Sequence, residues 1–209
     1  AFLPVAEESG LIVELGRQVL TAAVARVAAW RRLPSAADLR LSVNFSAQEL
    51  LHEARLPETL DVLAAAGLSP NVLTIEVLES VLFDEEGAMR NVLLEYARAG
   101  VSLALDDFGT GSSPLTSLRD VPVRALKIDR AFVSGIGSSL PDEAIVRAIR
   151  SLTDDLGLDC IAEGLEEEMQ RTWLTGAGVE YAQGYLLHRP LPADVLEALL
   201  RERLPGGAG

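Results

Sequence analysis

Short apolar runs that each end in polar side chains recur along the chain. The six runs cover residues 41–46, 73–80, 103–111, 125–130, 159–166 and 181–187. Apolar runs of this length, bounded by turn residues, are typical of buried strands. Between the runs, apolar residues recur every three or four positions, as they do on one face of a helix. The clearest helical segments are residues 10–30, 56–66, 85–99, 142–156, 166–175 and 193–203. The pattern therefore predicts strands that alternate with helices.

The polar residues that end these strands are spaced in a regular way. From Asn44, the steps to Glu76, Asp106, Lys127, Glu163 and Gln183 are 32, 30, 21, 36 and 20 residues. Each step has the length of a strand plus a returning helix, and right-handed βα units laid side by side close into a barrel. Polar groups at the carboxyl ends of its strands gather at one mouth. We therefore expect an α/β fold, a TIM-like (β/α)₈ barrel with these side chains together.

Two adjacent carboxylates, Asp106 and Asp107, follow the third apolar run. Neighbouring side chains on a strand point to opposite faces, so the pair can reach two ions, or one ion and the groups behind it. A lone Asp-Asp pair also suits a solvated turn, but further acids end other strands. With Asn44, Glu76 and Glu163, the pair offers hard oxygen ligands, which suit Mg²⁺ or Mn²⁺ rather than zinc or copper.

The composition favours one domain without a membrane span. The chain of 209 residues is 49% hydrophobic, and none of its apolar runs approaches the ~20 residues that a membrane span needs. We expect a single domain over residues 1–203 and a flexible tail over residues 204–209. The only cysteine, Cys160, lies in an apolar strand and cannot form an internal disulfide, so we expect a buried thiol and a cytoplasmic setting.

The formal net charge of −13 bears on the partners of the chain. It argues against DNA or RNA, because nucleic-acid binding rests on clusters of Lys and Arg. A mouth lined by carboxylates would also repel a small anionic phosphodiester, unless divalent cations invert the local field. An acidic site, an anionic substrate and bound metal are therefore consistent with one another.

Six strings of residues resemble the motifs of the EAL-domain family of cyclic di-GMP phosphodiesterases. In order, the strings are Val43–Ser46, Glu76–Ser80, Asp106–Gly111, Leu126–Asp129, Ala162–Glu166 and Tyr181–Tyr185. The resemblance begins at Phe2, in a lead-in to the first long helix, and runs to Pro192. It implies a hydrolase of bacterial second-messenger signalling that opens cyclic di-GMP to linear pGpG. The alternative is a catalytically silent cyclic di-GMP receptor or protein-interaction module, but every ligand that can be checked is present, which favours the enzyme.

The resemblance also implies a ligand set for a two-metal site. Asn44, Glu76 and Asp106 would hold one ion. Asp106 would bridge to a second ion, which Asp107 and Glu163 would also hold. Such a pair of ions clamps the phosphate and holds the attacking hydroxide.

Catalytic and substrate-binding roles are implied in the same way. Lys127 would orient the attacking water, so catalysis is assigned to Lys127, Glu163 and Asp106. The alternative for Lys127 is a structural ion pair with a neighbouring acid. Gln183 would bind the metal-site water or the phosphate region, and Asp129 would face the nucleotide, unless it caps a loop.

Supporting positions complete the predicted site. Glu79 stands three residues after the acid of the second strand, an offset that puts the two side chains on opposite strand faces. Both can be ligands only if the strand has ended by Glu79. The resemblance instead gives Glu79 the task of steadying the loop after the Asp-Asp strand, with Glu166 and Thr110 as further supporting residues.

The chain departs from the family in two places. The Glu-Ala-Leu triplet of the family's first strand would precede Phe2, and the only such triplet here, residues 197–199, lies in a helical run. Because the chain also begins at Ala1 rather than Met, we interpret it as a fragment that lacks this strand, and expect weak or no activity. In the loop after the Asp-Asp strand, Ser112 and Pro114 replace an aromatic residue and a serine; proline fixes φ and removes a donor. An upstream sensory or cyclase domain is expected, and a homodimer is left open.

Overall fold

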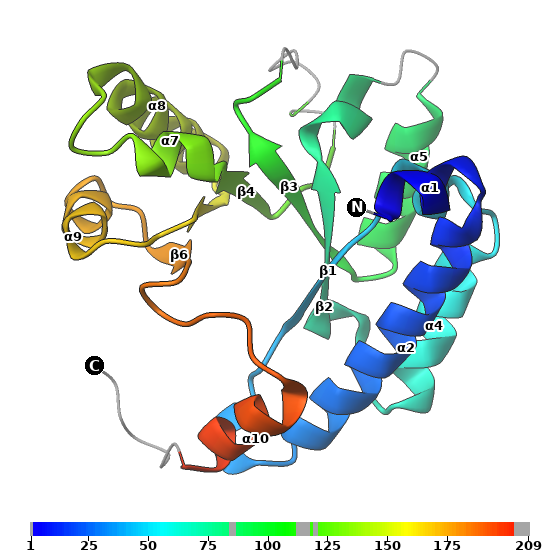
Figure 1. Cartoon of the computed structure of the whole chain (residues 1–209). Coiled ribbons are helices and arrows are strands. Elements are labelled where there is room, and N and C mark those ends of the chain that lie inside the picture. Colours follow the sequence, from blue (N-terminus) through cyan, green and yellow to red (C-terminus); the bar gives the residue numbers. More distant parts are fainter. Residues whose placement is uncertain (1, 84–86, 112–117, 119–120, 203–209) are drawn as a thin grey trace. The chain divides into compact units, whose positions relative to one another are not determined.

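The computed structural model describes residues 2–83, 87–111, 118 and 121–202 (Figure 1). Within these residues, the sheet has six strands in the order β1-β2-β3-β4-β5-β6. β3 pairs with β4, β4 with β5 and β5 with β6, and all three pairs are parallel. Strands that alternate with helices and pair with their neighbours in sequence are those of a (β/α)₈ barrel. The predicted α/β class is therefore confirmed.

The strands lie where the apolar runs predicted them. They are β1 (Leu41–Asn44), β2 (Leu73–Leu78), β3 (Ser102–Phe108), β4 (Ala125–Ile128), β5 (Asp159–Glu163) and β6 (Tyr181–Gln183). The predicted runs extend past the carboxyl end of every strand, and by the most at β6, because apolar residues 185–187 belong to the following loop.

The long helices also lie within a few residues of their predicted positions. The helices are α1 (Leu3–Glu8), α2 (Leu11–Trp30), α3 (Ala47–Leu51), α4 (Arg55–Ala65), α5 (Ala88–Arg98), α7 (Arg130–Ser134), α8 (Leu140–Leu156), α9 (Glu168–Gly176) and α10 (Ala193–Glu202). Short 3₁₀ turns are η1 (Pro34–Ala36), η2 (Pro70–Val72) and η3 (Glu79–Phe83). The short helices α3 and α7 were not predicted, because one turn and a half of helix carries too little periodicity to be detected.

The packing divides the chain into two compact units. The first consists of Ala1–Ile75, Glu95–Ser102 and Pro190–Gly209, and the second of Glu76–Leu94 and Leu103–Arg189. The single domain expected over residues 1–203 stays a prediction, and the tail over residues 204–209 lies outside the described residues.

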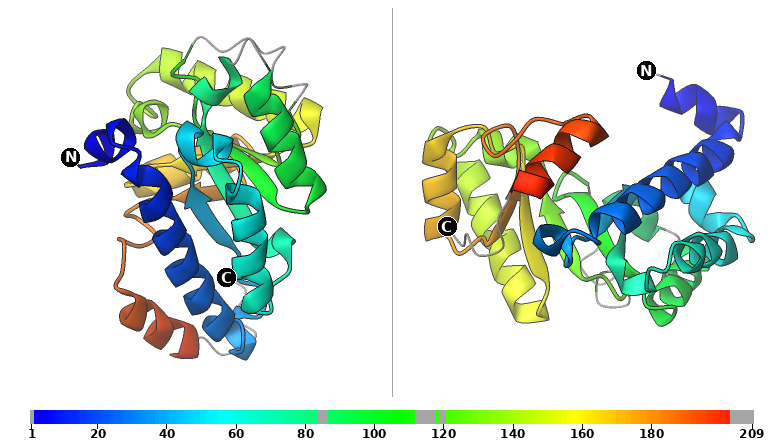
Figure 2. Two further views of the ribbon diagram at one scale, coloured as in Figure 1. Left: turned by 90° about the vertical axis from the view of Figure 1, so that its right-hand side faces the viewer. Right: turned by 90° about the horizontal axis from the view of Figure 1, so that it is seen from below.

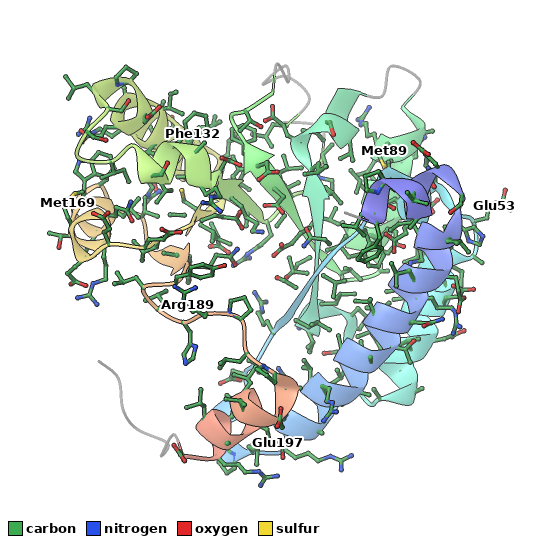
Figure 3. The ribbon with its side chains drawn as sticks, in the orientation of Figure 1. Glu53, Met89, Phe132, Met169, Arg189 and Glu197 are labelled. Carbon is green, nitrogen blue, oxygen red and sulfur yellow. The ribbon has the colours of Figure 1, made fainter. Side chains whose placement is uncertain are left out.

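In the first unit, α2 buries one apolar stripe. Its buried residues are Ile12, Leu20, Val24, Val27 and Trp30. α2 and α4 lie side by side (Figure 2). At the far end of α2, Trp30 donates its indole N–H to the carboxylate of Glu197 on α10, at 3.2 Å. Glu197 is labelled on α10 in Figure 3. The indole hydrogen bond lets a large aromatic side chain be buried without an unsatisfied donor.

In the second unit, the core lies between β4, β5 and the helices α7 and α8. All four residues of β4 are buried. Cys160 of β5 is a buried free cysteine, as expected, and burial raises the pKa of its thiol. Among the described residues, no helix is long and apolar enough to span a membrane.

Candidate active site

A buried ammonium group lies at the centre of the second unit. The side chain of Lys127, on β4, is 3% exposed. Its Nζ lies 2.6 Å from Glu76 Oε2, 2.9 Å from Asp106 Oδ1 and 2.6 Å from Glu163 Oε1. These acids come from β2, β3 and β5, so neighbouring strands bring their polar residues together as the sequence predicted. A buried charge needs such partners, because its transfer from water is otherwise costly.

Electrostatics keep this lysine charged. Burial lowers the pKa of the Lys127 ammonium, but its hydrogen bonds to the three carboxylates outweigh burial and raise the pKa above its ordinary value. Burial raises the pKa of Glu163, against the opposing effect of Lys127. One positive charge thus faces three carboxyl groups, and the excess negative charge favours a further cation.

At Asp107, the side chains of β3 cease to alternate between the two faces of the sheet. The φ of Asp107 is +52°, in the left-handed region that few residues other than glycine adopt. The pairing of β3 with β4 also shifts register between Leu105 and Phe108, which is the mark of a bulge. As a result, carboxylate oxygens of Asp106, Asp107 and Glu163 lie within 4.8 Å of one another. The expectation that the two adjacent aspartates point to opposite faces is therefore wrong, because the bulge turns both carboxylates into one cluster.

The surroundings of Asp107 raise the pKa of its carboxyl group. Its pKa is raised to about 6, first by burial, then by a hydrogen bond with Asp129 and by the charge of Asp106. Asp129 also caps α7, where its Oδ1 accepts a hydrogen bond from the backbone N–H of Ala131 at 2.6 Å. The two roles considered for Asp129, capping and facing the site, are therefore compatible.

Glu79 lies just beyond the end of β2, in η3, and is buried. Its Oε2 accepts a hydrogen bond from the backbone N–H of Gly109 at 2.9 Å. The hydroxyl of Thr110 donates to the backbone carbonyl of Asp107 at 2.9 Å. Both hydrogen bonds are made to the backbone at the end of β3 and just after it, and the supporting roles given to Glu79 and Thr110 stay predictions. Ser112 and Pro114 lie outside the described residues.

The remaining predicted residues lie at strand ends. Gln183 ends β6, pairs in register with Glu163 and donates from Nε2 to Glu163 Oε1 at 2.7 Å. Glu166 follows β5 with an exposed side chain, and its backbone N–H donates to Gln170 Oε1 at 2.9 Å. Asn44 ends β1 in the first unit. The roles given to these residues stay predictions.

One close backbone contact beside the site was not predicted. A Cβ atom on Gly184 would lie 2.1 Å from the backbone oxygen of Leu165. The N–H of Leu165 donates to the carbonyl of Gln183 at 3.0 Å, and the N–H of Leu186 donates to the carbonyl of Leu165 at 3.0 Å. The loop after β5 thus packs directly on the end of β6. The glycine that directly follows Gln183 is the signal that could have indicated it.

The carboxylate cluster fits a divalent cation. Oxygens of three acids lie close enough to contact one ion, and Lys127 already places a positive charge beside two of them. Carboxylates are the ligands that Mg²⁺ and Mn²⁺ prefer. The donor set therefore matches the chemistry of these metals.

Comparison with known proteins gives the family. The EAL domain profile matches residues 1–190, and the chain belongs to this family. It is 39% identical over 197 residues to the bifunctional diguanylate cyclase/cyclic di-GMP phosphodiesterase MucR of Pseudomonas aeruginosa, a match that covers 94% of this chain and 29% of that protein. The chain spans less than a third of the length of the curated relatives that it matches.

Solved structures agree with this result. The PaMucR phosphodiesterase in complex with c-di-GMP has a TM-score of 0.89 and 39% identity, and the match covers 93% of this chain and 78% of that one. The manganese and cyclic di-GMP complex of Klebsiella pneumoniae BlrP1 has a TM-score of 0.77 and 32% identity, over 85% of this chain and 44% of that one. The predicted family and its TIM-like fold are confirmed.

Proposed function

We propose that this domain is a metal-dependent phosphodiesterase that hydrolyses cyclic di-GMP to linear pGpG. The observation that carries the proposal is the cluster in which a single ammonium, that of Lys127, meets three carboxylates at 2.6–2.9 Å. Asp107 adds a fourth carboxyl group to the cluster. Support also comes from the relatives, because MucR is named a cyclic di-GMP phosphodiesterase and two similar structures hold cyclic di-GMP.

The metal ligands follow from the donor set and the family motifs. We assign Mg²⁺ or Mn²⁺ to Asn44, Glu76, Asp106, Asp107 and Glu163. When bound, two such ions neutralise the phosphate and lower the pKa of the attacking water. The excess of negative charge is what makes these side chains suitable for metal and, without metal, repulsive to a phosphodiester.

The other residues act on water and substrate. Lys127 donates hydrogen bonds within the cluster, and we assign it the orientation of the attacking water, since a fixed positive charge also favours the hydroxide form. Gln183 is assigned to the phosphate region, and Asp129 to the nucleotide. Because pGpG keeps its phosphate on a 5′ oxygen, the bond that breaks is the one between phosphorus and the 3′ oxygen, which leaves with a proton.

A turnover assay with the full-length protein tests this function. We expect pGpG to form from cyclic di-GMP with Mg²⁺ or Mn²⁺, and its formation to stop when EDTA is added. Asp106→Asn should abolish turnover, because it removes the negative charge of a carboxylate that contacts Lys127 and is a proposed metal ligand. If the wild-type protein binds cyclic di-GMP but forms no pGpG under any metal condition, the domain is a receptor and the phosphodiesterase proposal is wrong.

A further inference from the structure

The turn that follows Asn44 is fixed by one carboxylate of the first unit. Phe45 and Ser46 connect β1 to α3, and the Ser46 hydroxyl accepts a hydrogen bond from the backbone N–H of Glu49 at 3.2 Å. Glu49 Oε2 in return accepts from the backbone N–H of Ser46 at 2.9 Å and from its hydroxyl at 3.0 Å. This reciprocal capping box fixes the backbone two residues after Asn44.

A buried arginine holds that carboxylate. Arg55 Nη2 donates to Glu49 Oε1 at 3.0 Å, and the two side chains are 0% and 4% exposed. The guanidinium also lies over the ring of Phe45, with Cζ 4.4 Å from the ring centroid. Arg55 therefore acts on both residues that follow Asn44, directly on Phe45 and through Glu49 on Ser46.

Burial of the Glu49–Arg55 ion pair costs free energy that apolar side chains at the same positions would not cost. Arg55 begins α4, where the helix dipole opposes a positive charge. Its Nε and Nη1 are buried without a hydrogen-bond partner among the described residues. α2 packs directly against the ion pair, because a Cβ atom on Gly16 would lie 1.7 Å from Glu49 Oε1. Buried ion pairs add little stability compared with apolar side chains, so a positioning role accounts for this one better.

We propose that Arg55 is a positioning residue that orients Asn44, through Phe45 and through the Glu49–Ser46 capping box, and so sets the affinity of the site for divalent metal. The inference rests on the proposed function, in which Asn44 is a metal ligand. The ion pair plays the part of the outer contacts that orient ligands in metal sites.

Calorimetric titration of Mn²⁺ into the full-length protein tests the proposal. Arg55→Met leaves the Glu49 carboxylate buried without its cation, so we expect the dissociation constant for Mn²⁺ to rise about tenfold. The double variant Glu49→Gln/Arg55→Met removes both charges but keeps an oxygen that can accept from Ser46, so we expect affinity within about threefold of wild type. At saturating Mn²⁺, kcat of Arg55→Met should return to the wild-type value.

A matched control separates positioning from loss of stability. Leu63→Ala truncates a side chain of α4 that is 1% exposed and lies two helical turns beyond Arg55. We expect it to lower the melting temperature but to keep Mn²⁺ affinity within about twofold. If Leu63→Ala weakens Mn²⁺ binding as much as Arg55→Met does, or if Arg55→Met binds Mn²⁺ as the wild type does, the proposal is overturned.

Two further outcomes are informative. Should Arg55→Met fail to fold, Ser46→Ala takes its place, because it removes the hydroxyl contact with Glu49 and leaves the ion pair intact. We expect Ser46→Ala to weaken Mn²⁺ binding about threefold. Unchanged Mn²⁺ binding by this variant overturns the inference. If the wild-type protein binds no Mn²⁺ at all, the proposed function itself is wrong, and the inference falls with it.

Discussion

Two buried cations, one in each unit, differ in the charge that surrounds them. Arg55 is 0% exposed and pairs with one carboxylate, that of Glu49. Lys127 is 3% exposed and contacts the carboxylates of Glu76, Asp106 and Glu163. The first pair is neutral, whereas the second group carries more negative charge than its cation neutralises.

This difference in charge separates a group that fixes backbone from a group that binds ions. A buried pair without net charge does not attract a further ion. Its effect is to fix the two segments that carry its residues relative to each other. An acidic cluster with one cation lowers its free energy when divalent metal binds. Both groups contrast with surface pairs such as Arg171–Glu168, which are largely exposed and contribute little because water screens them.

Removal of a negative charge from the acidic cluster should lower activity the most. Glu163→Gln should lower kcat for cyclic di-GMP by at least about 100-fold, because it removes a proposed metal ligand and a partner of Lys127. Initial rates of pGpG formation by the full-length protein check this. Asp159→Asn makes the same loss of charge at the other end of β5, in a surface pair with Arg124, and should leave kcat within about twofold. Equal rates for Glu163→Gln and wild type would refute the assignment.

The neutral Glu49–Arg55 pair should instead be disrupted by a larger side chain placed against it. Gly16→Ala places a methyl group where Glu49 Oε1 now lies, and we expect the free energy of unfolding to fall by about 3 kcal/mol as the buried pair separates. Urea unfolding measures the change. For Gly176→Ala, in α9, the new methyl group meets no described atom within 4 Å outside the adjacent helix backbone, so the change should be neutral or stabilising by up to about 1 kcal/mol. A loss below about 1 kcal/mol for Gly16→Ala would mean that the pair is not closely packed.

The smallest effect concerns the stability of the metal-free protein. Folding raises the pKa of Asp107 from 3.8 to about 6, so the free energy of unfolding falls as the pH rises between these values, and the whole loss is present above pH 6. In EDTA at pH 8, Asp107→Asn should raise the free energy of unfolding by about 1 kcal/mol or less, because the side chain is partly exposed and screened. At pH 4 the folded carboxyl is protonated and the unfolded one is only partly ionised, so most of the gain should be lost. Asparagine tolerates the left-handed backbone, so an equal gain at both pH values would assign the effect to the backbone and not to charge.

Much of the fold followed from hydrophobic periodicity. The strand ends that carry Glu76, Lys127 and Glu163 were predicted within a few residues, because apolar runs and their polar boundaries are local features. The convergence of these residues in one cluster followed from the alternation of strands and helices. The bulge at Asp107 could not be predicted, since a positive φ at an aspartate depends on pairing between strands and not on local sequence.

The Glu49–Arg55 pair also escaped prediction. Nothing in the local sequence marks either charged residue as buried, because their burial comes from tertiary packing against α2. One signal was available, because Ser46 followed three residues later by Glu49 is the signature of a capping box. That signature predicts the start of α3, but it carries no information about Arg55.

Mn²⁺ titration of the chelator-treated full-length protein shows whether the acidic cluster of the second unit binds divalent metal. We expect saturable binding of two Mn²⁺ ions per domain by the wild type, and loss of binding in Asp106→Asn, whose carboxylate is assigned to both ions. Absence of saturable binding by the wild type, or unchanged binding by Asp106→Asn, would contradict the assignment of metal to this cluster.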